Sequence, residues 1–198
     1  MDKSPKITLA TESKARIDMF ARAGIDVATK PARIDEATIK ASLLSEETSP
    51  NDVADTLAEM KAQRVAGTQS GFVIGADQVL VCENQLFDKA PNMAAAKEKL
   101  KILQGKPHTL LSAAVIYEDA KPVWRTIGRA QLFMRPMEEV EIDQYLEAEG
   151  DSILSSVGCY FLEGRGATLF TRVQGDYFTV IGFPLLDVLG YLRTRGAI

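Results

Sequence analysis

A long apolar segment with two polar residues inside it constrains this chain more than any other feature. Residues 71–82 read Gly-Phe-Val-Ile-Gly-Ala-Asp-Gln-Val-Leu-Val-Cys. Continuous apolar runs of this length are typical of a strand that is covered on both faces. Asp77 and Gln78 interrupt the run, and an acidic residue that closes a buried strand either costs desolvation energy or lies at a sheet end where ligands bind. The alternative is a turn aspartate that is bonded by backbone amides.

Helical and strand patterns alternate along the rest of the chain. Strands are expected at residues 7–11, 108–117 and 123–133, with two more strand-like pieces flanking Gly164-Arg165-Gly166. Helices are expected up to Gly24, from Ser49-Pro50 to Gly67, and over residues 93–103, 137–149 and 184–195. The pattern predicts an α/β fold, with a mixed twisted sheet and helices packed on its faces, in one domain spanning residues 1–198.

Composition excludes several classes of partner. The chain has 198 residues, a formal net charge of -4 and a pI near 5.2, which argues against binding a nucleic acid polymer. The two cysteines, Cys82 and Cys159, are isolated in sequence, as is usual in a reducing compartment. The start of the chain lacks a long apolar region, and no later stretch is apolar enough to span a membrane. We therefore expect a cytoplasmic, unanchored protein.

Several catalytic arrangements are missing from the sequence. His108 is the single histidine, and no Gly-x-Ser-x-Gly elbow is present, so a serine hydrolase triad is not expected. Neither a P-loop nor a Gly-x-Gly-x-x-Gly fingerprint occurs. We interpret His108 as a packed or hydrogen-bonded strand residue.

Carboxylates at two places suggest a metal site. Asp35-Glu36 adds an acidic pair to Asp77, although such a pair alone is more typical of a helix cap or a solvated face. Oxygen ligands suit Mg²⁺, which commonly bridges a few carboxylates to substrate phosphates. Asp35 is the weaker candidate, because on an extended segment it would point away from its neighbour.

Three cations could balance the charge of a triphosphate. They are Arg16 in the first expected helix, Lys61 in the second, and Lys89 just after the strand of Asp77. Each alone is more typical of an exposed, solubilising residue. Their occurrence together with the carboxylates favours a phosphate site.

The order of these segments resembles the Maf family of nucleoside triphosphate pyrophosphatases. Ser13 and Arg16 match the family's opening motif, whereas Lys14 and Ala15 replace a proline and an arginine or tryptophan. Ala90 stands where proline is usual. Matching segments follow in the family's order at residues 35–36, 57–62, 75–77, 88–89, 105–109, 157–167, 175–177 and 182–185.

The resemblance implies a site, a metal and a reaction. It implies an ITP-pyrophosphatase-like fold with a nucleotide cleft, in which a nucleoside triphosphate is hydrolysed to monophosphate and pyrophosphate with Mg²⁺ or Mn²⁺. The resemblance leaves open whether the protein forms a homodimer. The implied catalytic residues are Asp77, Glu36 and Lys89, with Glu36 and Asp77 as metal ligands and Ser13, Arg16 and Lys61 as substrate-binding residues.

Three positions bear on which nucleotide base the enzyme would accept. By resemblance, Asp77-Gln78 and Glu163 match the subgroup that acts on 7-methyl-GTP, whereas dTTP/UTP pyrophosphatases have Asp-Thr and a glutamine. Ala15 replaces the tryptophan of the 7-methyl-GTP subgroup. The expected substrate is a modified nucleotide such as 7-methyl-GTP, in a role that cleans the nucleotide pool. The alternatives are a dTTP/UTP pyrophosphatase and a non-catalytic, nucleotide-binding or division-associated homologue.

Overall fold

The computed structural model describes residues 6–198, in which seven strands form one sheet. Hydrogen bonds join the strands in the order β2-β1-β3-β5-β6-β7, and β4 pairs with β3. The strands are β1 (Ile7–Leu9), β2 (Ala28–Thr29), β3 (Phe72–Cys82), β4 (Gln85–Phe87), β5 (Pro107–Glu118), β6 (Lys121–Met134) and β7 (Phe170–Gln174). β1 is parallel to β2 and β3, whereas β4 and β7 are antiparallel to their partners, so the predicted mixed sheet is confirmed.

The chain forms two compact units, and each is discontinuous in sequence. The first unit contains the residues up to Gln78 together with 111–128 and 177–198, and the second contains residues 79–110 and 129–176. The single domain expected from the sequence stays a prediction. No helix within residues 6–198 is long and apolar enough to cross a membrane.

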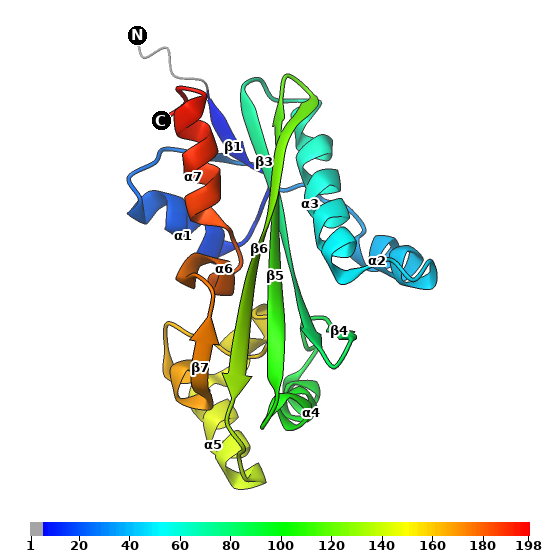
Figure 1. Cartoon of the computed structure of the whole chain (residues 1–198), viewed down its shortest axis with the longest axis vertical. Helices are drawn as coiled ribbons and strands as arrows, with labels where there is room; N and C mark the ends of the chain where they lie inside the picture. The colour runs from blue at the N-terminus through cyan, green and yellow to red at the C-terminus, as the bar shows by residue number, and fades with distance from the viewer. Residues whose placement is uncertain (1–5) are drawn as a thin grey trace. The chain divides into compact units, whose positions relative to one another are not determined.

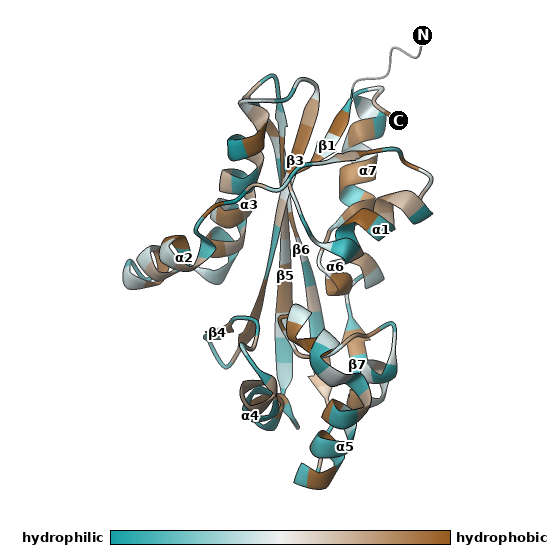
Figure 2. Ribbon diagram, turned by 180° about the vertical axis from the view of Figure 1, so that it is seen from behind, coloured by the Kyte–Doolittle hydropathy of each residue, from teal (hydrophilic) through white to brown (hydrophobic). Residues whose placement is uncertain are grey.

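Helices cover both sides of the strands in the first unit. α2 (Glu36–Ser45) and α3 (Pro50–Ala66) lie on one side, and α1 (Lys14–Arg22), α6 (Tyr177–Ile181) and α7 (Leu185–Thr194) lie on the other (Figure 1). A hydrophobic core that includes Phe20, Phe72 and Phe183 fills the space beneath α1 and α7. The hydrophobic colouring of β1 and α7 is plain in Figure 2. Burial of this apolar surface is the main force that fixes these helices on the strands.

The helix α3 begins where the sequence predicts it. The Ser49 hydroxyl accepts a hydrogen bond from the Asp52 N–H at 3.3 Å, and Pro50 occupies the first turn, where its missing N–H is harmless. The buried face of α3 includes Val53, Leu57 and also Lys61. The buried face of α3 therefore places the charged side chain of Lys61 against the sheet.

Two helices of the second unit pack together. α4 (Met93–Leu103) starts at Asn92, whose side chain accepts from the Ala95 N–H at 2.9 Å, and it contacts α5 (Glu139–Glu149). The 3-10 helices η1 (Gly150–Ser155) and η2 (Arg165–Leu169) follow α5. His108 is buried on β5, where its Nε2 lies 2.7 Å from the Tyr160 hydroxyl, so its interpretation as a hydrogen-bonded strand residue is confirmed.

Three local predictions are wrong. Asp77 does not close the buried strand, because β3 continues through it to Cys82. Asp35 is not on an extended segment: it caps α2 and accepts hydrogen bonds from the Thr38 N–H and hydroxyl at 3.1 and 2.8 Å. The strand-like piece before Gly164 is a series of turns, although the piece after it forms β7. The short helices α2 and α6 were not expected.

Candidate active site

A buried ammonium joins two carboxylates in the first unit. The Lys61 Nζ donates to Asp77 Oδ1 at 2.7 Å and lies 3.0 Å from Glu36 Oε2. The Lys61 and Asp77 side chains are 10% and 9% exposed, whereas the Glu36 side chain is 55% exposed. The structure thus brings together three of the residues that the sequence singled out, and Glu36 is the one that solvent reaches most easily.

A glycine allows α3 to approach β3 closely enough for this contact. A Cβ atom at Gly75 would lie 2.1 Å from the Ala58 carbonyl oxygen and 2.5 Å from the Ala62 N. Any larger residue would therefore push the helix away from the strand. Because Lys61 precedes Ala62 and Asp77 follows Gly75 by two residues, this packing sets the distance between their side chains.

Arg16 is fixed by two backbone carbonyls. Its Nε donates to the Gly182 oxygen at 2.9 Å, and its Nη1 donates to the Ala76 oxygen at 2.8 Å. Burial lowers the pKa of the Arg16 guanidinium, and the negative charges of Asp77 and Glu36 act in the opposite direction. The guanidinium has five N–H donors, so these two bonds orient it and leave others for an anion.

Gln78 points to the opposite face of β3 from Asp77, as neighbours in a strand do. Its side-chain nitrogen lies 3.1 Å from each of three acceptors, which are the Ser112 hydroxyl and the Thr179 and Val180 carbonyls. These bonds attach β3 to α6. The geometry therefore gives Gln78 a structural task, whatever it contributes to base choice.

The remaining candidates in the first unit lie at the start of two helices. Ser13 is the N-terminal cap residue of α1, its side chain makes no capping bond, and its N–H donates to the Thr11 hydroxyl at 3.0 Å. Ala15 is half-buried in the first turn of α1. Hydrogen bonds from the Thr38 N–H and hydroxyl lower the pKa of Asp35, so this carboxylate serves α2.

The second unit carries two of the predicted residues on exposed loops. Lys89 follows β4 in the segment before α4, and Glu163 precedes η2. Both residues are exposed. An exposed charge of this kind is open to a polar ligand and needs no burial of its own before it binds.

Comparison with known proteins decides the family. The chain matches the family described as Maf-like protein over residues 6–195. The chain belongs to the Maf family. It is 43% identical to a nucleoside triphosphate pyrophosphatase of Caulobacter vibrioides, over 97% of this chain and 96% of that protein. It is also 43% identical to a 7-methyl-GTP pyrophosphatase of Mesorhizobium japonicum, over 98% of each chain.

The resemblance to this family that the sequence motifs indicated is therefore confirmed. The relatives bear the name of a hydrolase that acts on acid anhydrides, as the prediction of a pyrophosphatase requires. Among solved structures, the Staphylococcus aureus Ham1 protein aligns with a TM-score of 0.41 and 12% identity, over 66% of this chain and 71% of that chain.

Asp77 and Glu36 are the carboxylates of this Maf protein that the sequence singled out as metal ligands. Within residues 6–198, no group of three or more His, Cys, Asp or Glu side chains could hold a metal ion. Asp77 and Glu36 nevertheless converge on one cation, the Lys61 ammonium, at 2.7 and 3.0 Å. One or two carboxylates, completed by water and substrate phosphates, are a usual set for Mg²⁺. The residues present fit a metal that the substrate helps to bind.

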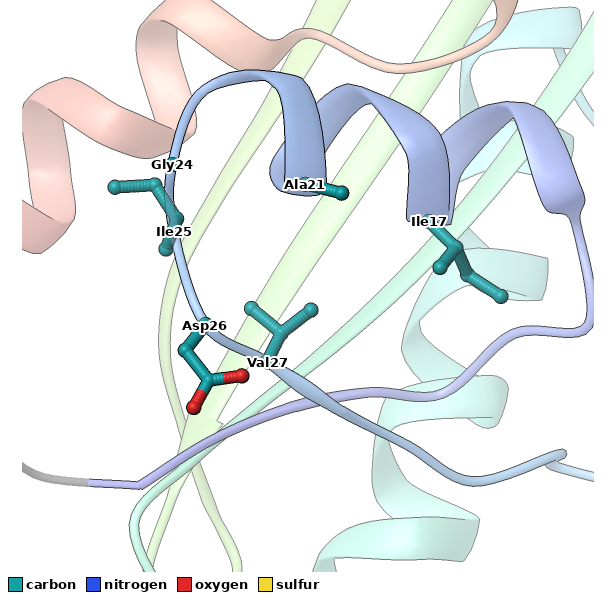
Figure 3. A pocket seen from close by; sticks show the side chains of 6 residues that line it. All are labelled: Ile17, Ala21, Gly24, Ile25, Asp26 and Val27. Atoms are coloured by element: carbon teal, nitrogen blue, oxygen red, sulfur yellow. The ribbon is translucent and has the colours of Figure 1, made fainter.

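A separate pocket lies beside the C-terminal end of α1 (Figure 3). Its volume is about 330 Å³, and Figure 3 labels Ile17, Ala21, Gly24, Ile25, Asp26 and Val27 around it. This lining includes none of the clustered side chains of Arg16, Glu36, Lys61 and Asp77. With one carboxylate and no cation in its lining, the pocket does not suit a triphosphate.

Sequence reasoning missed the polar residues that support the candidates. Ser112 is a buried polar residue whose hydroxyl helps to hold Gln78, beside the backbone carbonyl of Thr179, and Lys99 is a buried lysine on α4. The only signal for Lys99 was a lysine on the apolar face of an expected helix. That signal is weak, because long lysine side chains often cover apolar surface with the charge in solvent.

Proposed function

We propose that this Maf protein hydrolyses 7-methyl-GTP to its monophosphate and pyrophosphate, within the general nucleoside triphosphate pyrophosphatase activity that its family supports. The observation that carries the general activity is the contact of Lys61 with both Asp77 and Glu36, beside the anchored Arg16. Cations and carboxylates in one place provide both phosphate binding and activation of water.

The reaction requires water to attack the α-phosphorus. The new bond joins the water oxygen to phosphorus, the bond to the bridging oxygen of the β-phosphate breaks, and pyrophosphate leaves with the electron pair. In our proposal the Asp77 carboxylate orients the attacking water and accepts its proton. Arg16, Lys61 and Lys89 bind phosphate oxygens, and Ser13 adds a hydroxyl donor. These cations offset the charge that develops on the phosphates.

Asp77 and Glu36 would hold the divalent metal, Mg²⁺ or Mn²⁺. A bound metal would supply a Lewis acid that polarises phosphate oxygens. Lys61 already balances both carboxylates, and the exposed Glu36 is the partner that can be withdrawn from it most easily. The protein therefore offers carboxylates whose charge is balanced before the substrate arrives.

Two residues favour the methylated guanine base. The pair of Gln78 and Glu163 is the pattern expected of the 7-methyl-GTP subgroup, and the Mesorhizobium japonicum relative bears that name. A carboxylate can accept hydrogen bonds from the ring N–H and amino group of guanine, and it also attracts the positive charge that methylation adds. Ala15 provides no aromatic platform for the base. A cytoplasmic location goes with this proposal, since nucleotide pools are found there.

A panel of triphosphates tests the proposal. 7-methyl-GTP, GTP, UTP, CTP and dTTP would be compared with Mg²⁺ or Mn²⁺, and monophosphate and pyrophosphate would be measured separately. We expect kcat/KM to be highest for 7-methyl-GTP. A preference for dTTP or UTP would replace the proposal with the pyrimidine alternative. Tight binding without pyrophosphate release would indicate a non-catalytic homologue.

A substitution on the exposed loop then tests the base contact. Glu163→Gln is expected to lower kcat/KM for 7-methyl-GTP more than for UTP, because it removes a charge that attracts the methylated base. Glu147→Gln makes the same change at an exposed position of α5 and serves as the control. Equal losses on both substrates would remove Glu163 from base selection.

A further inference from the structure

The second unit contains a buried lysine that the proposed reaction does not use. Lys99 lies on α4 and is 7% exposed. Its Nζ donates to the Asp88 carbonyl oxygen and, at 3.0 Å, to the Val157 carbonyl oxygen. A buried ammonium needs such partners, because its transfer from water is otherwise very costly. One side chain thus joins two loops that are far apart in sequence.

A buried thiol strengthens the same connection. The Cys159 sulfur is fully buried, and the Lys99 ammonium and the Ala90 N–H both act on its pKa. Burial raises the pKa of the Cys159 thiol, and Lys99 and the Ala90 N–H oppose that rise. The first loop is therefore held at Asp88 by Lys99, and its Ala90 N–H acts on the Cys159 thiol. Lys89 is the residue between these two attachment points.

The second loop is held in an unusual conformation. Cys159 has a φ of +56°, in the left-handed region that residues other than glycine rarely adopt. Such a conformation costs on the order of 1 kcal/mol or more and persists only where the surroundings impose it. The surrounding contacts here include the bond from Lys99 to the Val157 carbonyl at 3.0 Å, the bond from the Cys159 N–H to the Ser156 carbonyl at 3.3 Å, and the bond from the Ser156 hydroxyl to the Tyr160 carbonyl at 2.8 Å. The same loop continues to Glu163.

We infer that Lys99 is a positioning residue, which together with Cys159 fixes the backbone on both sides of Lys89 and so places the Lys89 ammonium for the substrate. The inference rests on the proposed function, because it assigns Lys99 an effect that passes through a phosphate-binding residue. It requires no contact between Lys99 and the nucleotide. A displaced loop would leave Lys89 charged and exposed but in the wrong position. Small displacements of catalytic groups reduce rates strongly.

Amide hydrogen exchange tests the structural part of the inference. Lys99→Met keeps the length of the side chain and removes the donors, and we expect exchange about 10-fold faster in peptides covering residues 88–91 and 157–160. Lys101→Met, at a more exposed position of the same helix, is the matched control and should leave these peptides unchanged. Unchanged exchange in folded Lys99→Met would overturn the inference.

A double-mutant cycle tests the link to Lys89. Lys99→Met is expected to lower kcat/KM about 10-fold in the otherwise unmodified protein, but less than about 2-fold when Lys89 is already alanine. Lys99→Arg retains N–H donors and should recover part of the activity. Cys159→Ala removes the thiol on which Lys99 and the Ala90 N–H act, and it should give a smaller loss of the same kind if Lys99→Met folds poorly. Equal losses in both Lys89 backgrounds would overturn the positioning role.

The exchange and kinetic experiments distinguish failure of this inference from failure of the proposed function on which it rests. If the unmodified protein releases no pyrophosphate from any triphosphate, the proposed function fails and Lys99 loses its assigned effect. If the unmodified protein is active and Lys99→Met disturbs neither exchange nor kcat/KM, only the inference fails. Faster exchange together with a loss that depends on Lys89 supports both.

Discussion

Two buried lysines of this protein bind different kinds of partner. Lys61, on α3 in the first unit, holds the side-chain carboxylates of Asp77 and Glu36. Lys99, on α4 in the second unit, holds the backbone carbonyls of Asp88 and Val157. Side-chain carboxylates can exchange one cation for another, whereas backbone carbonyls fix the path of the chain. A buried ammonium can thus balance side-chain charges in one unit and fix the path of the backbone in the other.

The largest effect on activity should come from a change to Asp77, one of the two carboxylates that Lys61 holds. Asp77→Asn keeps the side-chain size but removes the charge that orients water or holds metal, and we expect kcat to fall about 1,000-fold. Steady-state kinetics at saturating metal, with circular dichroism as a check on folding, measure this. A rate near that of the unmodified protein would mean that the Lys61 cluster is structural.

Removal of Lys61, the cationic partner of Asp77, should lower the stability of the fold. Lys61→Met leaves the nearly buried Asp77 carboxylate without its cation, so the free energy of unfolding should fall by about 3 kcal/mol. Urea denaturation provides the measurement, and Arg64→Met, exposed on the same helix, is the control. The double variant Lys61→Met with Asp77→Asn should be more stable than Lys61→Met alone, since no uncompensated charge remains. Additive losses would contradict an ion pair at this position.

His108 is a third buried basic group, and unlike the two lysines it should make stability depend on pH. Burial lowers the pKa of His108 from 6.5 to about 4, so the unfolded chain binds a proton that the folded chain rejects. Stability from this group is complete above the unfolded pKa and is lost as pH falls towards 4. Between pH 7 and pH 5 the free energy of unfolding should fall by about 2 kcal/mol more than in His108→Asn. Denaturation of both proteins at several pH values measures this, and parallel profiles would show that His108 is charged in the fold.

The smallest effect concerns a neutral side chain. Gln78→Thr removes the amide that reaches Ser112 and two carbonyls of α6, so the free energy of unfolding should fall by about 1 kcal/mol. Combined with Glu163→Gln, it should shift preference towards pyrimidine triphosphates. A change in kcat/KM by one common factor for 7-methyl-GTP and UTP would confine Gln78 to support of α6.

The sequence predicted the regular elements better than the polar contacts between them. Apolar periodicity, Ser49-Pro50 and the terminal glycines were enough to place α3, α4 and most strands. The strand β3 was harder, because a charged residue in an apolar run usually marks its end. Asp77 stays inside the strand because Lys61, sixteen residues earlier, supplies its counter-charge, and this tertiary contact leaves no local pattern.

The candidate residues were found by motif, and their different roles became visible only in three dimensions. Asp35 and Glu36 are neighbours, yet one caps α2 and the other reaches Lys61. Asp77 and Gln78 are neighbours on opposite faces of β3. Lys99 could not be found, because its partners are backbone carbonyls, which every residue has. A sequence records which side chains are present, whereas main-chain acceptors become specific only through folding.

The return of residues 177–198 to the first unit sets an order for biosynthesis. A ribosome makes residues 79–176, the whole span from which the second unit is drawn, before it makes the carbonyls of Thr179, Val180 and Gly182. Gln78 and Arg16 therefore lack these carbonyl acceptors until translation has passed α6, whereas Ser112 and the Ala76 carbonyl are made earlier. Units generally fold as they emerge, so the second unit can fold on the nascent chain while the first is incomplete. The first unit is therefore completed only after the span of the second unit has been made, and the Arg16 Nε gains its Gly182 acceptor at that stage.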